Sequence, residues 1–489
     1  MNSEFKQKVT SGVIWSGIER LGWQLVHFGV SIILARLLMP VDFGKVAILS
    51  VIITVITALT DCGFGQALVQ KKELSEVDKS SVFWLNLVLC LLGYIILWGM
   101  APLIERFYET SGLIWLLRIL GLRIIFSGLT VVHNAMLNRN MNFSLRTKLN
   151  LATMLASSVL GVTLAYLDYG AWALVAMMVS QSVLYMLGLW SVNHWYPNRV
   201  FCFQSVKKLF RFGVNMMLTQ LLDSTISNLQ PLLIGKFYAL DTLAYYNRGN
   251  GYPSLLMSST NSVISNVMFP ALSQLNGNQE EFKQLARRSI RFAMFLTQPL
   301  LFLLLLTAKP LILLMLTTKW NDAIIFLQIS CITMLFWPLH VSNLQMLSAI
   351  GKSNIVLILE LIKKGLLLVC ILCSLQFGAV AMAWGIAALS TFFVFINAWP
   401  NRRLVGYGVI EQLRDALPYT LLSACTAGIC WGWSWYVNNH LLLLILQIVS
   451  GGIIYFLLCH HFCPNELIWI SKFLRQKLLM FQRHQNISA

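Results

Sequence analysis

The chain has 489 residues, of which 57% are hydrophobic and only 11% are charged. Soluble globular proteins carry about 25% charged residues, so this composition excludes a soluble protein and indicates a polytopic membrane protein. The formal net charge of +17 does not require a nucleic-acid partner, because basic residues collect in the cytoplasmic loops of membrane proteins.

Fourteen apolar runs are long enough to cross a membrane, since a spanning helix needs about 20 mostly apolar residues. The first six predicted helices are Gly12–Leu38, Phe43–Ala67, Val82–Ile104, Leu113–Leu137, Leu149–Leu167 and Ala171–Val192. The next six are Phe212–Ile234, Leu243–Ala271, Ile290–Ala308, Ala323–Ile350, Ile355–Leu375 and Gly378–Ala398. The last two are Ala416–Val437 and Leu441–His461. We therefore expect an all-α protein with about 14 transmembrane helices.

Lysine and arginine gather in alternate loops, which predicts that both termini are cytoplasmic. The tail Glu466–Arg483 alternates apolar and basic residues, and this pattern is typical of an amphipathic helix at the membrane surface.

An internal repeat divides the sequence. Ala101–Ile104 recurs as Lys309–Ile312, and Tyr169–Ala173 recurs at the same separation as Phe377–Ala381. The repeat unit holds six predicted helices, an even number, so both copies have the same orientation in the membrane. This predicts two six-helix lobes, 1–204 and 205–404, around a central cavity. Residues 405–489 add two helices and the basic tail.

The first predicted helix carries polar residues along one face. They recur at intervals of three and four, as Ser16, Arg20, Gln24 or His27, and Ser31. A charged side chain within the membrane costs about 2.5–3.5 kcal/mol, so such residues normally face protein or water. One interpretation is a cavity-lining stripe. The other is a Glu19–Arg20 pair near the cytoplasmic interface, with Arg20 reaching outward. The role of Glu19 stays open.

The seventh predicted helix is polar too. Asn215, Thr219, Asp223 and Ser227 follow each other at intervals of four, a pattern that a lipid-facing helix does not tolerate. We expect the leading helix of each repeat to flank the same aqueous space. The alternative is hydrogen bonding between helices.

Arginines also occur within the predicted helices, at Arg118, Arg123 and Arg248. A guanidinium pairs with phosphate through two hydrogen bonds and stays charged, so several arginines in a cavity favour an anionic, phosphorylated substrate. For Arg248 the alternative is an anchor at the outer membrane interface.

Three carboxylates are candidates for binding a coupling proton or Na⁺: Asp61, Asp223 and Glu360. They are equally consistent with structural partners of Arg20 or Lys363. The sequence has no phosphate-binding loop and no nucleophile elbow. Direct ATP coupling is therefore not expected. We expect no catalytic residue, no metal site and no cofactor.

Several segments resemble the Wzx-type polysaccharide exporters, with the colanic-acid-exporter-like branch as the closest subgroup. The most specific is Leu34–Gly44. The others are Asp61–Lys72, Val82–Asn86, Ala101–Ile104, Tyr169–Leu174 and Phe269–Ser273. This family belongs to the multidrug/oligosaccharidyl-lipid/polysaccharide superfamily, and the resemblance covers about the first 400 residues.

The resemblance implies a flippase in the bacterial plasma membrane for surface polysaccharide synthesis. It would move undecaprenyl-pyrophosphate-linked oligosaccharide from the cytoplasmic to the periplasmic leaflet by alternating access. Its partners would be this lipid-linked anionic oligosaccharide and membrane lipid, with a polysaccharide polymerase and assembly proteins as further candidates. In the similar lipid II flippases, arginines on the first helix line a cationic cavity, and Arg20 holds a comparable place here.

On this interpretation the substrate-binding residues are Arg20, Gln24, His27, Asn215, Thr219, Asp223 and Arg248. One alternative function is a cation-coupled drug antiporter of the same superfamily, in which fewer cavity arginines are expected. Another is a membrane-embedded glycan polymerase or ligase, which usually needs a large outer loop for its catalytic residues.

Overall fold

The computed structural model describes residues 22–71, 73–275 and 277–463, and every element in these ranges is a helix. Packing divides the chain into two units, Met1–Ala244 and Tyr245–Ala489. The first unit therefore includes the seventh predicted helix. The lobe boundaries at residues 204 and 404, which follow from the sequence repeat, stay predictions.

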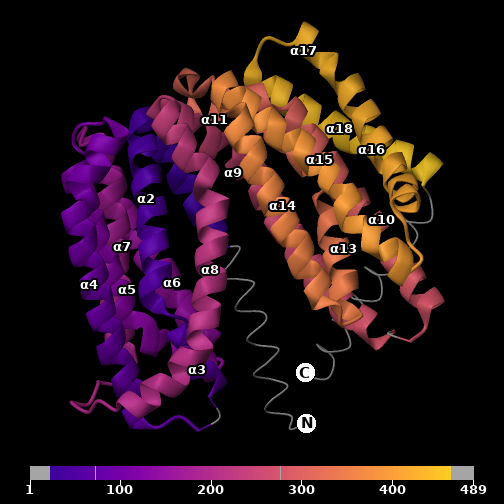
Figure 1. The fold of residues 1–489 in the computed structure, drawn as a ribbon. Coiled ribbons are helices and arrows are strands. Elements are labelled where there is room, and N and C mark those ends of the chain that lie inside the picture. The colour runs from indigo at the N-terminus through magenta and orange to yellow at the C-terminus, as the bar shows by residue number, and fades with distance from the viewer. Residues whose placement is uncertain (1–21, 72, 276, 464–489) are drawn as a thin grey trace, which may run out of the picture. The chain divides into compact units, whose positions relative to one another are not determined.

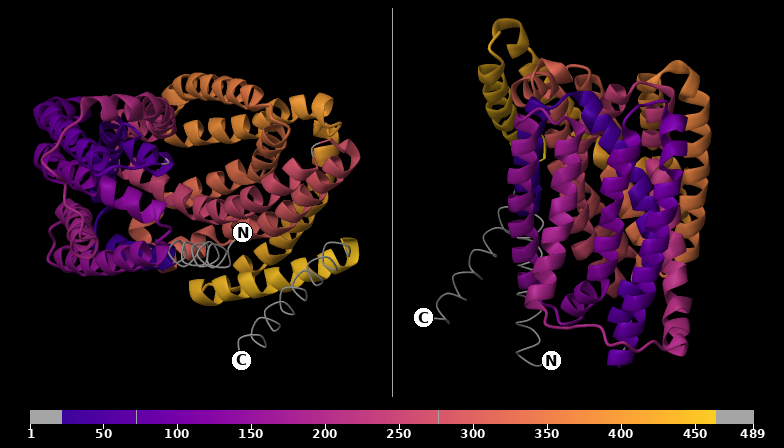
Figure 2. Two further views of the ribbon diagram at one scale, coloured as in Figure 1. Left: turned by 90° about the horizontal axis from the view of Figure 1, so that it is seen from below. Right: turned by 90° about the vertical axis from the view of Figure 1, so that its left-hand side faces the viewer.

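The first unit is a bundle of helices that run roughly alongside one another (Figures 1 and 2). It contains the helix Gly22–Leu37, then α2 (Pro40–Asp61), α3 (Phe64–Gln70), α4 (Glu76–Tyr108), α5 (Leu113–Arg139), α6 (Phe143–Tyr166), α7 (Ala171–Val192) and α8 (Phe203–Phe237).

The second unit begins within α9 (Leu240–Gln274). It continues with α10 (Gln279–Leu306), α11 (Ala308–Leu316), α12 (Ala323–Met334), α13 (Trp337–Ala349), α14 (Ser353–Ser374), α15 (Ala379–Leu404), α16 (Val409–Trp431), α17 (Trp433–Tyr436) and α18 (His440–Phe462). Two short 3₁₀ turns, Thr318–Trp320 and Leu375–Phe377, precede α12 and α15.

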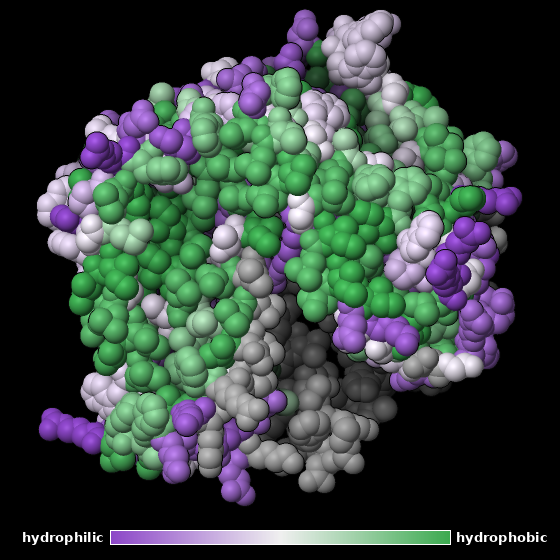
Figure 3. All heavy atoms as spheres, viewed as in Figure 1, coloured by the Kyte–Doolittle hydropathy of each residue, from purple (hydrophilic) through white to green (hydrophobic). Residues whose placement is uncertain are grey.

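Within the described ranges, 9 membrane-spanning candidates are long and apolar enough. They are α2, α4, α5, α6, α7, α10, the pair α12–α13, α15 and α18. The other five predicted spans are also helical where they are described, but their sequences are shorter or more polar. On the face shown in Figure 3, hydrophobic residues cover the middle of the helices of each unit. The chain is a multi-pass helical membrane protein, and the count of fourteen spans stays a prediction.

Three predicted runs are interrupted where the sequence suggested continuous helices. The run from Phe43 breaks between α2 and α3, where Cys62 and Gly63 both have left-handed backbone angles. The tenth run breaks before α13, which has Pro338 in its first turn, because proline cannot continue the hydrogen bonds of the preceding helix. The thirteenth breaks at Gly432.

The break after α2 allows α8 to approach very closely. A Cβ atom added to Gly213 on α8 would lie 2.2 Å from the carbonyl oxygen of Cys62, and one added to Gly63 would lie 2.7 Å from the carbonyl oxygen of Gly213. Only glycine tolerates these distances. Inside a membrane, such close packing rather than the hydrophobic effect holds helices together. This contact places α8 beside α2 and α3.

The core of the first unit lies where α2, α4, α5 and α7 meet. Leu49, Leu97, Leu117 and Val175 come one from each of these helices and are fully buried. These apolar contacts fix the four helices relative to one another, so polar residues on neighbouring faces of the same helices hold defined positions.

Two loops related by the predicted repeat each end in a glycine with a positive φ. Gly170 before α7 and Gly378 before α15 both have positive φ, 54° and 97°, and glycine adopts this conformation without strain. The two helices begin at the equivalent residues Ala171 and Ala379. The sequence repeat is thus matched in each unit by a helix that starts directly after a glycine with positive φ.

In the second unit, α10 and α16 are joined by a charged cluster. Both Arg287 and Arg291 on α10 bind the carboxylate of Asp415 on α16, at 2.8 Å and 2.5 Å. The hydroxyl of Tyr407 donates to the same carboxylate at 2.9 Å. Asp415 is almost fully buried, whereas the two arginines are partly exposed. The buried carboxylate is thus fully paired.

Beside this cluster lies a network of buried amides. Asn343 on α13 and Gln412 on α16 exchange two hydrogen bonds, of 2.7 Å and 2.9 Å. Asn401 on α15 donates to the side-chain oxygen of Asn343 at 2.7 Å. The network therefore connects α13, α15 and α16 through buried hydrogen bonds.

Candidate functional site

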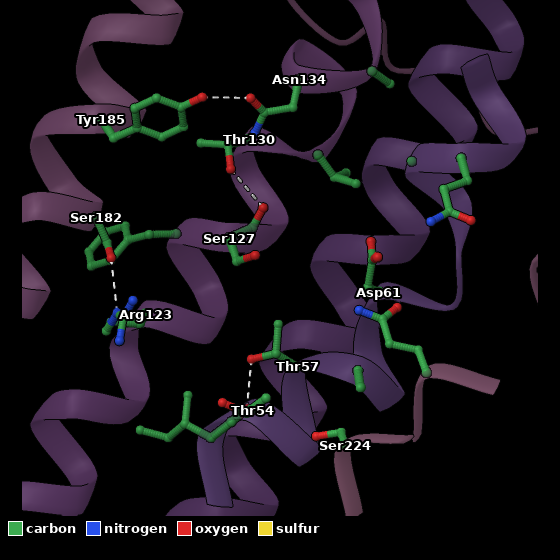
Figure 4. Close-up of a pocket in the computed structure, with 18 of the residues that line it drawn as sticks. Thr54, Thr57, Asp61, Arg123, Ser127, Thr130, Asn134, Ser182, Tyr185 and Ser224 are labelled. Carbon is green, nitrogen blue, oxygen red and sulfur yellow. Dashed lines mark hydrogen bonds between the residues drawn. The ribbon is translucent and has the colours of Figure 1, made fainter. Parts of the chain in front are cut away.

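The first unit contains a polar cavity of about 720 Å³ between α2, α3, α5, α7 and α8. This volume is within the range of about 300–1,000 Å³ that is typical of small-molecule sites. Figure 4 shows the side chains that converge on it. All of the lining residues belong to the first unit.

Four helices each present a polar stripe to the cavity, because residues three and four apart share one helical face. On α2 the stripe is Ser50, Thr54, Thr57 and Asp61. On α5 it is Arg123, Ser127, Thr130, Asn134 and Asn138. On α7 it is Ser182 and Tyr185, and on α8 it is Gln220 and Ser224.

Arg123 and Asp61 are the charged residues of this lining. The Nε of Arg123 donates to the hydroxyl of Ser182 at 3.2 Å (Figure 4), which orients the guanidinium. Its two terminal nitrogens make no hydrogen bond to residues in the described ranges. Among the residues that the structure describes, neither Arg123 nor Asp61 has an ion-pair partner within 4.0 Å. A charged group within a membrane helix is by default a candidate for a binding or transport role.

The uncharged groups supply both donors and acceptors. The hydroxyls of Thr54 and Thr57 donate to the backbone carbonyls of Ser50 and Ile53, each at 2.8 Å, so their oxygen lone pairs remain able to accept. The hydroxyl of Tyr185 donates to the side-chain oxygen of Asn134 at 2.7 Å (Figure 4), which orients the amide. The cavity can therefore bind a ligand that has both donors and acceptors.

The structure places some of the predicted site residues in this cavity and others elsewhere. Asp61 lines it. Arg20 and Glu19 lie outside the described residues. On the helix Gly22–Leu37, Gln24 is half-buried, while His27 is exposed and stacks on Trp23 with ring centres 4.7 Å apart.

The predicted residues of α8 have different positions. Asp223 is exposed and does not belong to the lining, although its neighbours Gln220 and Ser224 do. The side chains of Asn215 and Thr219 lie outside the described part of the helix. The proposed roles of these residues stay predictions.

The remaining candidates lie in the second unit. Arg248 on α9 is half-buried, with its guanidinium 5.2 Å from the ring centre of Trp320. Glu360 pairs with Lys363 one turn along α14, at 2.6 Å, which is the structural partner that the sequence offered as an alternative to ion coupling.

The helical fold is shared with solved membrane transporters and flippases. The structure is similar to the lipid II flippase MurJ in its inward closed conformation, with a TM-score of 0.70, 15% identity, and coverage of 94% of this chain and 100% of MurJ. It is also similar to an inward-facing MATE multidrug transporter, with a TM-score of 0.59, 15% identity, and coverage of 81% and 98%. The predicted superfamily fold is confirmed.

The chain belongs to the family described as "Polysaccharide biosynthesis protein", whose model matches residues 33–325. It is 22% identical to the teichuronic acid biosynthesis protein TuaB of Bacillus subtilis over 484 residues, 96% of this chain and 98% of TuaB. It is 28% identical to the succinoglycan biosynthesis transport protein ExoT of Rhizobium meliloti over 295 residues, 60% and 59% of the two chains. It is 23% identical to the lipopolysaccharide biosynthesis protein WzxC of Escherichia coli over 332 residues, 67% of each chain. The resemblance to Wzx-type exporters is confirmed.

Proposed function

We propose that the protein is a flippase that moves a lipid-linked oligosaccharide across the plasma membrane for surface polysaccharide synthesis. The observation that carries this proposal is the polar cavity inside an apolar helix bundle, in a chain of the polysaccharide biosynthesis family. A membrane protein maintains such a cavity at a cost in stability, so the cavity indicates passage or binding of a polar group. ExoT is named as a succinoglycan biosynthesis transport protein, and MurJ is named as a lipid II flippase. Similarity to these two proteins supports transport of a glycan or its lipid-linked precursor.

In its finer form, the proposal is that the cargo is undecaprenyl-pyrophosphate-linked and passes from the cytoplasmic to the periplasmic leaflet of the bacterial inner membrane. Both termini are cytoplasmic, and the mechanism is alternating access. Arg20 and Arg248 attract the pyrophosphate, since guanidinium groups match phosphate oxygens. The protein acts without catalysis, next to a polymerase and assembly proteins.

A strain that lacks the protein tests the proposal. Its radiolabelled lipid-linked intermediate should accumulate in the cytoplasmic leaflet, where a periplasmic glycan-modifying probe does not reach it. Loss of a polymerase or ligase would instead leave the intermediate accessible from the periplasm. That second outcome would contradict transport as the function.

The pyrophosphate role is tested by Arg20→Ala. We expect a variant that is inserted at normal amounts to export glycan at least ten-fold more slowly, because one charge-assisted hydrogen bond is worth about 1.5–3 kcal/mol. Export at the wild-type rate would refute the role of Arg20 alone.

A drug antiporter is the second candidate, because the fold is also that of the MATE transporters. Extrusion of a cationic dye by cells that overproduce the protein would support it. Of the three carboxylates proposed for ion coupling, Asp61 lies in a cavity. In the wild type, export driven by a proton or Na⁺ gradient can be measured. If the Asp61→Asn variant loses this gradient-driven export, coupling at Asp61 is supported.

A further inference from the structure

We propose that the cavity of the first unit is a saccharide subsite, which binds the sugar portion of the cargo and does not bind its pyrophosphate. This inference rests on the proposed flippase function and deepens it. It assigns the recognition of the glycan to a set of residues that includes Asp61, Arg123 and Tyr185.

The lining of the cavity has no net formal charge. Arg123 is basic and Asp61 is acidic, and the other residues that the structure places around the cavity are uncharged at neutral pH. The formal charges therefore cancel. A pyrophosphate brings at least two negative charges, and burying them against a neutral lining leaves them uncompensated, which costs far more than hydrogen bonds return.

The hydrogen-bonding groups of the lining match those of a sugar. A sugar hydroxyl both donates and accepts, so a sugar-binding site needs both kinds of partner in one small volume. Arg123 supplies terminal N–H donors, because its Nε is already bound to Ser182. Asp61 supplies two carboxylate oxygens, and the threonine hydroxyls supply further acceptors because their hydrogens point to the helix backbone.

The lining also contains aromatic rings. Phe126 of α5 and Tyr185 of α7 are the aromatic residues of the lining, and aromatic rings pack against the apolar C–H faces of ring-shaped ligands. The lining residues of α2, α5 and α7 come from helices that the apolar core holds in fixed positions. A rigid frame of this kind lowers the entropic cost of binding a polyol.

Binding to the purified protein in lipid nanodiscs tests the inference directly. The first probe is the free oligosaccharide released by mild acid from the lipid-linked intermediate that accumulates in the deletion strain. The second probe is inorganic pyrophosphate. We expect the oligosaccharide to bind and excess pyrophosphate not to displace it.

Two variants remove the charges of the cavity one at a time. In Asp61→Asn and Arg123→Gln the affinity for the oligosaccharide should fall about 10- to 100-fold each, as expected for losing hydrogen bonds to charged groups. The matched controls are Asp168→Asn, at an exposed residue between α6 and α7, and Arg118→Gln. The guanidinium of Arg118 lies 4.3 Å and 5.1 Å from the ring centres of Trp98 and Trp115, and Arg118 does not line the cavity. Both controls should bind like the wild type.

Three outcomes would overturn the inference. One is competition by pyrophosphate at equal concentration. Another is unchanged oligosaccharide affinity in both cavity variants. The third is that the Asp61→Asn variant stops export but keeps full affinity for the oligosaccharide. Asp61 would then be a coupling residue and would not bind the saccharide. If Arg123→Gln does not fold, Ser182→Ala keeps the arginine but removes its anchor, and a loss of a few-fold in affinity is then expected.

The deletion strain separates the two proposals. If no lipid-linked intermediate accumulates, the flippase function is wrong, and the saccharide subsite is wrong with it. If the intermediate accumulates but its oligosaccharide does not bind, the flippase function stands and only the subsite is refuted.

Discussion

The cavity of the first unit and the charged cluster of the second unit both place polar side chains inside apolar helices, but they differ in how these groups are paired. In the cluster, Arg287 and Arg291 share the carboxylate of Asp415, and Tyr407 adds a third contact. In the cavity, the described part of the chain gives Arg123 a single hydroxyl as its partner, that of Ser182. A polar residue within a membrane helix therefore has two uses, and the completeness of its pairing distinguishes them.

The difference has an energetic consequence. Removing one member of a buried ion pair is strongly destabilising, because the other member is left without compensation. Removing a buried charge that lacks a strong partner relieves a cost instead. Substitutions in the cluster should thus lower stability, and substitutions in the cavity should lower transport.

Asp415→Asn should have the largest effect on stability. The buried carboxylate has three partners, and its loss leaves two neighbouring guanidinium groups to repel each other. We expect a decrease of about 2–3 kcal/mol in the free energy of unfolding, somewhat below the value for a fully buried pair because both arginines are partly exposed. Unfolding of the purified protein in mixed micelles measures it.

The control is Asp322→Asn, which removes an exposed acid of the same unit. A variant of Asp415 as stable as this control would show that the cluster does not hold α10 and α16 together.

Gln412→Leu should have the next largest effect. It keeps a side chain of similar size but removes the two hydrogen bonds with Asn343 and the one to the carbonyl oxygen of Tyr407. We expect a loss of about 1–2 kcal/mol, since buried groups lose their partners. The same unfolding measurement applies, and unchanged stability would mean that water or another side chain replaces the amide.

Arg123→Met should change stability by less than about 1 kcal/mol, and in the stabilising direction, because a partly buried charge with one partner is replaced by an apolar side chain. Export should fall at least ten-fold. A variant that loses as much stability as Asp415→Asn would show that Arg123 is a structural residue, and the contrast between the two regions would disappear.

The sequence predicted the helices well because apolar runs of about 20 residues have few alternatives in a membrane. It did not predict the interruption at Cys62 and Gly63. That break depends on the approach of Gly213 from a distant part of the chain, and spacing along one helix carries no information about such a contact.

The sequence predicts a central cavity between two lobes and does not predict this cavity inside the first unit. Asp61 and Arg123 each stand out as charged residues within apolar runs, but nothing in the sequence indicates that α2 and α5 face the same space. The stripe from Ser50 to Asp61 has the same three- and four-residue spacing as the stripe of the first helix. The spacing of its uncharged polar residues, more than its one charge, is the sequence signal of this stripe.

Tyr185→Phe should have the smallest effect on stability. It tests whether Tyr185 belongs to the binding cavity or to the structural contacts. It removes one hydroxyl that orients Asn134 and leaves the aromatic ring in place. Because water in the cavity can replace the lost hydrogen bond, the free energy of unfolding should change by only about 0.5 kcal/mol. The oligosaccharide affinity should still fall a few-fold, because Asn134 loses its fixed orientation. An equal or larger effect on stability than on affinity would place Tyr185 among the structural contacts, with Gln412, instead of in the binding site.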